Sequence, residues 1–227
     1  MTENIISAAN LVKIYRARNS EVTALNGVSL NIDAGEYVAV MGPTGSGKST
    51  LLNILGLIDD WDSGEYSFMG QNMGLCSEKK RSALRKANIS FIFQDFNLID
   101  EMSIFENVEM ALFHFDYTEE ERRRRVCETL DMLDILSFSR LFPRQLSGGE
   151  KQRAAVARAL VSNPGLILAD EPTGKLDEDR ADEVMKILEE RHRKGATIVM
   201  ATHSEKSAGC AGRILRLLDG RIVWENL

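Results

Sequence analysis

Short apolar runs bounded by glycine and polar residues alternate with helix-like patterns along this chain. Residues 28–32 alternate between apolar and polar side chains, which is typical of a half-buried strand. The runs at 37–41, 166–170 and 197–203 are almost continuously apolar, so we expect buried strands, and central parallel ones for the last two. Near the C-terminus, Asp219-Gly220 between two apolar runs predicts a hairpin turn. The overall alternation indicates an α/β fold.

The strand signal stops between Phe96 and Leu160. Within this stretch Thr118 and Glu121 have the spacing of a capping box, and apolar residues follow at helical spacing as far as residue 136. We therefore expect a helical subdomain over about residues 96–160, inserted into a single domain that spans residues 1–227.

Composition narrows the classes of function. The chain has 227 residues and a formal net charge of −6, which disfavours a nucleic-acid partner because such binders need a basic surface. Its three cysteines show no CxxC spacing, so the sequence predicts neither a disulfide frame nor a zinc site and suits a reducing cytoplasm. The start lacks signal-peptide features, and no apolar run reaches the ~18 residues of a membrane span. We expect membrane contact only through a partner.

A glycine-rich segment, GPTGSGKST, matches the phosphate-loop pattern G-x-x-x-x-G-K-[ST] in full. Glycines allow the backbone to aim N–H groups at a phosphate, and the helix that follows adds its positive end. We expect Lys48 to reach the β- and γ-phosphates and the Ser49 hydroxyl to ligate Mg²⁺. The candidate nucleotide-binding residues are Gly42, Pro43, Thr44, Gly45, Ser46, Gly47, Lys48, Ser49 and Thr50.

An acidic pair ends another apolar run, LILADEP. We expect Asp170 to hold Mg²⁺ through a water and Glu171 to polarise the attacking water. A helix cap or a solvated turn is the alternative, and it is the less favoured one beside a complete phosphate loop.

Six motifs occur together in one order: the phosphate loop, SFIFQ, LSGGE, LILADEP, GKLD and ATHS. In order and approximate spacing they resemble the ATP-binding subunits of ABC transporters, and the resemblance covers nearly the whole chain. LSGGE ahead of KQRAAVARAL is the specific element. The resemblance implies the ABC ATPase fold, with a P-loop NTPase core, a mostly parallel central sheet, an N-terminal antiparallel β subdomain and an inserted helical subdomain. It also implies ATP hydrolysis with ATP and Mg²⁺ as cofactors.

The same resemblance implies roles for three further residues. Tyr15 would stack on adenine, Gln94 would contact Mg²⁺ and the attacking water, and His203 would contact the γ-phosphate. By position alone, such a tyrosine and a lone histidine after a strand are more often structural, and a glutamine at a strand end indicates little.

LSGGE itself has two explanations. Ser147 and Glu150 form a capping box, which explains a helix start but not Gly148 and Gly149. Glycines at this position would allow another backbone or a ligand to approach closely. Unpaired N–H groups at the helix start, together with a serine hydroxyl, form an anion site. The resemblance implies that the anion is the γ-phosphate of ATP on a second copy, in a head-to-tail homodimer.

The segments LLNILGLIDDWDSGEYSFMGQNM and FIFQDFNLI resemble the branch of lipoprotein-release, macrolide-export and antimicrobial-peptide-resistance ATPases and the FtsE cell-division group. This branch implies a motor subunit at the inner face of the membrane that drives a separate integral membrane permease, docked through residues 95–112. One alternative is an FtsE-like mechanical signalling ATPase without transport. Another is an ABC-type ATPase for assembly or nucleic-acid work.

Three positions depart from the family's pattern. Lys175 in GKLD stands where a small or amide residue is usual, and Ser204 stands where aspartate is frequent. The turn DDWDSGEY replaces a version that contains proline. Lys175 would contact the opposing subunit or alter the timing of hydrolysis.

Overall fold

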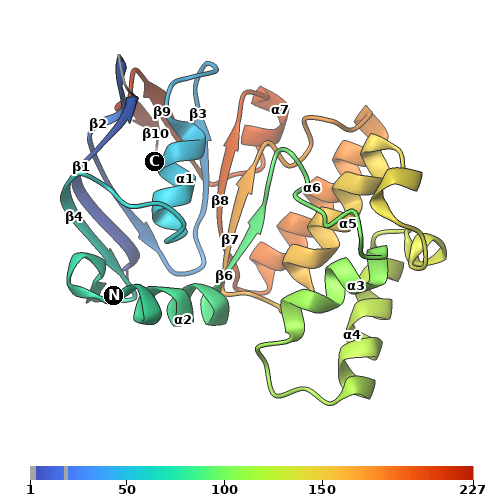
Figure 1. Ribbon diagram of the computed structural model, residues 1–227. Coiled ribbons are helices and arrows are strands. Elements are labelled where there is room, and N and C mark those ends of the chain that lie inside the picture. The colour runs from blue at the N-terminus through green and yellow to red at the C-terminus, as the bar shows by residue number, and fades with distance from the viewer. Residues whose placement is uncertain (1–3, 18–19, 227) are drawn as a thin grey trace.

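Two β-sheets form the left and the centre of the molecule in Figure 1, a computed structural model that describes residues 4–17 and 20–226. One sheet is antiparallel, with the strand order β2-β1-β4-β5, and the other has the order β10-β9-β3-β8-β7-β6. The first contains β1 (Asn4–Ala17), β2 (Ser20–Asp33), β4 (Ser63–Phe68) and β5 (Gln71–Asn72). The second contains β3 (Tyr37–Met41), β6 (Ile89–Ile92), β7 (Leu166–Asp170), β8 (Thr197–Thr202), β9 (Arg213–Leu218) and β10 (Arg221–Asn226).

The second sheet is mostly parallel, as the sequence predicts. From β9 to β6 every neighbouring pair runs parallel, and only β10 pairs antiparallel with β9. The β9–β10 turn has positive φ angles of 48° at Asp219 and 72° at Gly220, which a tight hairpin turn of two residues requires. The α/β class, the parallel core and the N-terminal antiparallel sheet are confirmed.

Helices fill the space between the sheets and cover the outer face of the parallel sheet (Figure 1). Helix α1 (Lys48–Leu55) lies between the sheets, where Leu51, Leu52, Ile54 and Leu55 are fully buried. The remaining helices are α2 (Glu78–Asn88), α3 (Ile104–Glu109), α4 (Glu119–Met132), α5 (Gly148–Leu160), α6 (Glu178–Arg193) and α7 (Glu205–Ala208). Of these, α5 and α6 form the helical layer beside the sheet, with α3 and α4 beyond it. None of the helices in the described ranges is long and apolar enough to cross a membrane.

Residues 96–160, all of which are described, contain helices and turns and no strand. The capping box of Thr118 and Glu121 begins α4 as predicted. The helix ends at Met132, however, and not at residue 136 as the apolar spacing suggests. Asp134 adopts a φ of 52°, the left-handed conformation that ends many helices. Leu133 remains buried nonetheless, so the apolar spacing correctly predicts burial but not helix length.

Candidate functional site

Four neighbouring strands bring the predicted chemistry to one edge of the sheet. Because β3, β8, β7 and β6 are parallel, their carboxyl ends meet there, which is where ligands bind in open α/β sheets. The phosphate loop follows β3, His203 follows β8, Asp170 ends β7, and Gln94 lies just beyond β6. A cavity of about 380 Å³ opens at this edge. The predicted residues that line it are Tyr15, Thr44, Gly45, Gly47, Lys48, Ser49, Thr50, Gln94, Asp170, Glu171 and His203.

The phosphate loop depends on its glycines for reasons within this chain. Gly47, the residue before α1, has a φ of 105°, and a Cβ there would lie 2.3 Å from the carbonyl oxygen of Ala24. A Cβ on Gly42 would lie 2.2 Å from the carbonyl oxygen of Leu217. Since no side chain caps α1, the N–H groups of its first turn are free to bind an anion.

Two buried donors in this loop fit a phosphate group. The Lys48 ammonium donates to the carbonyl oxygens of Gly42 and Pro43 at 2.8 and 3.0 Å, although the residue is only 8% exposed. The buried Ser46 hydroxyl has no hydrogen-bond partner among the described residues. An anionic oxygen accepts a stronger hydrogen bond than a carbonyl does, so a bound phosphate would draw Lys48 to itself.

Asp170 and Ser49 supply oxygen ligands of the kind that Mg²⁺ prefers. Burial raises the pKa of Asp170, and the Ser49 hydroxyl beside it acts in the opposite direction. Within the described part of the chain, no three His, Cys, Asp or Glu side chains group together as a metal site. Mg²⁺ usually takes one or two carboxylates together with substrate phosphates and water, so a pair beside a phosphate loop is a sufficient protein contribution.

Glu171 is held in an uncommon backbone conformation. Its φ is 48°, and its N–H donates to the Ala201 carbonyl oxygen at 2.9 Å. Its carboxylate lies 2.8 Å from His203 Nδ1 and accepts a 3.4 Å hydrogen bond from the Thr202 hydroxyl. Left-handed conformations of larger residues are strained and cluster at functional sites. The structure thus joins Glu171 and His203, and it adds Thr202, for which the sequence offers no signal beyond its place before His203.

Tyr15 borders the cavity from β1. Its side chain is 43% exposed, and its hydroxyl donates to Asp59 Oδ2 at 2.7 Å. Burial raises the pKa of this hydroxyl, and the hydrogen bond with Asp59 acts in the same direction. The ring therefore has surface left for a ligand while its hydroxyl is engaged.

The LSGGE residues lie elsewhere. Ser147, Gly148, Gly149 and Glu150 are not among the described residues that line the cavity. They begin α5 with a complete capping box, in which the Ser147 N–H donates to Glu150 Oε2 at 2.7 Å. Apart from its two chain neighbours and the backbone of its own helix, no atom of the described residues lies within 4 Å of a Cβ built on Gly148.

Helix α5 is nonetheless tied to the cavity. The Gln152 amide donates to the carbonyl oxygen of Pro172, next to Glu171, at 2.9 Å. Arg158 donates to the carbonyl oxygen of Phe96, two residues after Gln94, at 2.7 Å. Hydrogen bonds thereby connect α5 with the segments that directly follow the acidic pair and the glutamine.

Lys175 contacts its own chain. Its ammonium lies 2.8 Å from Asp95 Oδ1 and 4.5 Å from the centre of the Phe96 ring. The departure in GKLD therefore joins this segment to the residues that follow Gln94.

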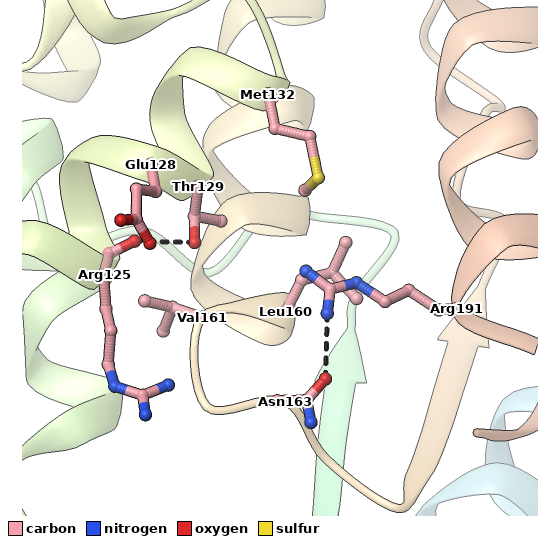
Figure 2. A pocket seen from close by; sticks show the side chains of 8 residues that line it. All are labelled: Arg125, Glu128, Thr129, Met132, Leu160, Val161, Asn163 and Arg191. Carbon is pink, nitrogen blue, oxygen red and sulfur yellow. Dashed lines mark hydrogen bonds between the residues drawn. The ribbon is translucent and has the colours of Figure 1, made fainter. Parts of the chain in front are cut away.

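A second cavity, of about 270 Å³, lies between α4, the end of α5 and α6 (Figure 2). Two of its polar side chains hydrogen-bond to neighbours, while the buried Arg125 Nε has no hydrogen-bond partner among the described residues. Arg191 donates to Asn163 Oδ1 at 2.8 Å, and the Thr129 hydroxyl donates to the Arg125 carbonyl oxygen at 2.8 Å. None of the predicted site residues is among the described residues that line it, so the sheet edge remains the candidate site.

Comparison with known proteins agrees with this geometry. The model of the ABC transporter family matches residues 25–174. The chain belongs to the ABC transporter family. It is 44% identical over 222 residues to a macrolide export ATP-binding/permease protein, MacB, of Chlorobium luteolum, covering 98% of this chain and 33% of that protein. The chain thus spans about a third of the length of this relative.

Two ABC cassettes match over nearly their full lengths. The uncharacterized ABC transporter ATP-binding protein MJ1508 of Methanocaldococcus jannaschii is 42% identical, with 96% of this chain and 98% of that protein covered. The structure superposes on the cassette MJ0796, solved as a dimer in a post-hydrolysis state with ADP and Pi, with a TM-score of 0.93, 39% identity and 97% of each chain covered.

These matches confirm several of the predictions. This ABC chain is an ATPase cassette whose cofactors are ATP and Mg²⁺. The predicted branch, which includes the macrolide-export ATPases, is confirmed as well.

Proposed function

We propose that two copies of this chain bind ATP between them head to tail. In each site the phosphate loop, Tyr15, Gln94, Asp170, Glu171 and His203 belong to one copy, and residues 147–150 belong to the other. Closure on ATP and opening after hydrolysis then drive conformational change in a membrane permease. The relative named above as an ATP-binding/permease protein, and the solved dimer of a similar cassette, support this assembly.

The observation that carries the proposal is the position of the LSGGE residues. They present a helix N-terminus and a serine, the features of an anion site, yet they do not line the cavity of their own chain. Symmetric pairing supplies them from a second copy and completes two sites at once.

Each residue then has a chemical task. Lys48 leaves the carbonyl oxygens of its own loop and pairs with phosphate oxygens, while Ser147 of the second copy donates to the γ-phosphate. Glu171 accepts a proton from the attacking water, and His203 holds that carboxylate and contacts the γ-phosphate. Mg²⁺, which Ser49, Asp170 and Gln94 would hold, supplies positive charge against the charge that develops on the phosphoryl group.

In this proposal the permease docks on the surface next to β6. A cavity of about 430 Å³ lies there and is lined by Phe93, Asn97, Met110 and His114 among others. Phe113, which directly follows the predicted docking residues 95–112, is 62% exposed. Phe113→Asp should keep the basal ATPase rate and lose its stimulation by membranes that contain the permease. Val223→Asp, at an exposed position on β10, is the control, and equal stimulation of both variants would contradict this surface.

Mixing two inactive variants tests the shared site. Lys48→Ala removes the phosphate-loop cation, and Ser147→Arg blocks the LSGGE end, so each alone should lose about 10²–10³-fold in turnover. A mixed dimer contains one intact site, built from the phosphate loop of the Ser147→Arg copy and the LSGGE of the Lys48→Ala copy. An equal mixture should therefore recover up to about a quarter of the wild-type rate.

The control is a mixture of Lys48→Ala with Glu171→Gln, which alter the same half of the site. Their mixed dimer has no intact site and should stay inactive. Recovery in both mixtures, or in neither, would contradict a site shared between two copies.

A further inference from the structure

The turn after α1, residues 59–66, contacts the aromatic residue that borders the cavity. Asp59, the first acidic residue of this turn, accepts the Tyr15 hydroxyl at Oδ2, 2.7 Å away. Its other oxygen, Oδ1, lies 2.8 Å from the Lys13 ammonium. One carboxylate thus joins two side chains of β1 that are 44 and 46 residues away in sequence.

Lys13 completes a closed cluster around Tyr15. Its side chain is 12% exposed, and its ammonium also donates to the Asp60 carbonyl oxygen at 2.7 Å. The same ammonium lies 5.0 Å from the centre of the Tyr15 ring, within the range of a cation–π contact. The hydroxyl end of Tyr15 is therefore tethered, and a cation occupies one side of its ring.

Another carboxylate of the turn, that of Asp62, holds the neighbouring backbone. Asp62 accepts from the Ile14 N–H at 2.7 Å, directly before Tyr15. The Asp60 side chain pairs with Arg81, whereas the Tyr15 hydroxyl bonds to Asp59, so Asp60 offers an acidic control in the same turn.

We propose that Asp59 and Lys13 are positioning residues that hold the Tyr15 ring for stacking on the nucleobase. This inference rests on the proposed function, in which Tyr15 carries the base. A tyrosine side chain that is free to rotate must be ordered when the base binds, and pinning its hydroxyl removes that loss beforehand. Lys13 over the ring withdraws π-electron density, which favours offset stacking of an electron-rich purine on the open side.

Base-specific binding tests the inference. Calorimetry measures the Kd of ADP and of inorganic pyrophosphate, each with Mg²⁺, because neither ligand is hydrolysed and only ADP has a base. Asp59→Ala should weaken ADP about 2- to 10-fold, the range of one lost hydrogen bond, and leave pyrophosphate unchanged. Asp59→Asn keeps an acceptor for the hydroxyl and should recover most of the affinity for ADP. Asp60→Ala should change neither ligand.

Tyr15→Ala provides the reference. It should weaken ADP about 5- to 100-fold, the range for a lost base–aromatic stack, again without effect on pyrophosphate. In that background, Asp59→Ala should weaken ADP no further, because the ring that it positions is gone.

Three results would overturn the inference, and they have different meanings. If Tyr15→Ala leaves ADP unchanged relative to pyrophosphate, the role of Tyr15 in the proposed function fails as well. If Tyr15→Ala acts but Asp59→Ala does not, only the positioning role fails. If Asp59→Ala weakens both ligands equally, Asp59 supports the phosphate loop or the fold and not the base.

Discussion

Two helices of this chain begin at glycine-rich segments, and the glycines serve different ends. Before α1, Gly47 has a φ of 105°, and a Cβ there would lie 2.3 Å from a backbone oxygen. At the start of α5, no described atom outside the helix backbone and the adjacent residues lies within 4 Å of a Cβ on Gly148, and a capping box satisfies the helix end. The fold of one chain explains the first glycine and leaves the second unexplained.

Gly47 is therefore required by contacts within its own chain, whereas Gly148 is not. Glycine is destabilising by about 0.5–1 kcal/mol relative to alanine in a helix interior, because the unfolded chain has more freedom to lose. A glycine that its own chain does not need therefore indicates close approach by something else. For α5, we propose that this is ATP on a second copy.

The largest test of the comparison removes the water-activating carboxylate. Glu171→Gln should lower the hydrolysis rate about 10²–10⁴-fold, because a general base is lost, while ATP binding persists. The phosphate loop of one copy and the LSGGE residues of the other then remain bound to the same unhydrolysed ATP. The variant should therefore elute as a dimer with ATP and as a monomer with ADP. Light scattering on a sizing column measures this, and a monomer in ATP would contradict the shared site.

The next test adds one methyl group at the start of α5. Gly148→Ala should slow turnover about 10²-fold, because displacing the γ-phosphate contact by about 1 Å has an effect of that size. Its free energy of unfolding should stay within about 0.5 kcal/mol of wild type, since Gly148 is exposed and the added Cβ meets open space. Phosphate release and urea unfolding measure the two effects. Normal turnover would mean that nothing approaches Gly148.

The same substitution before α1, at Gly47, should lower the stability of the fold instead. Gly47→Ala places a side chain in a left-handed conformation, which destabilises by about 1–2 kcal/mol, and the clash with Ala24 adds to this. We expect the free energy of unfolding to fall by at least about 2 kcal/mol. Equal urea midpoints for Gly47→Ala and Gly148→Ala would remove the distinction between the two segments.

The smallest effect concerns the link between the two regions. Leu176 lies 3.5 Å from a Cβ built on Gly149, and the adjacent Lys175 pairs with Asp95 beside Gln94. The lysine and aspartate side chains are 40% and 85% exposed, so the pair contributes about 0–1 kcal/mol. Lys175→Ala should therefore change the ATPase rate at most about 5-fold.

Asp95→Ala serves as the matched variant for that link. It should act in the same direction as Lys175→Ala, and the double variant should add nothing further. Independent, additive effects on the rate would show that the contact is not what either residue contributes.

Features of this fold that depend on residues close together in the sequence were predictable, and those that depend on distant residues were not. The runs at 37–41 and 166–170 coincide with β3 and β7, because a buried parallel strand needs apolar side chains on both faces. The end of α4 was not predictable from apolar spacing, since Leu133 stays buried although the helix has ended. There the left-handed turn at Asp134 decides the boundary.

The candidate site shows the same division. The sequence by itself determined the phosphate loop, the acidic pair at the end of β7 and the capping box at Ser147, because each depends on residues that are neighbours in the chain. Only the tertiary structure decided which residues meet. The pairing of Tyr15 with Asp59 and of Lys175 with Asp95 spans 44 and 80 residues. Such contacts follow from strand order and packing, which local patterns of polarity do not encode.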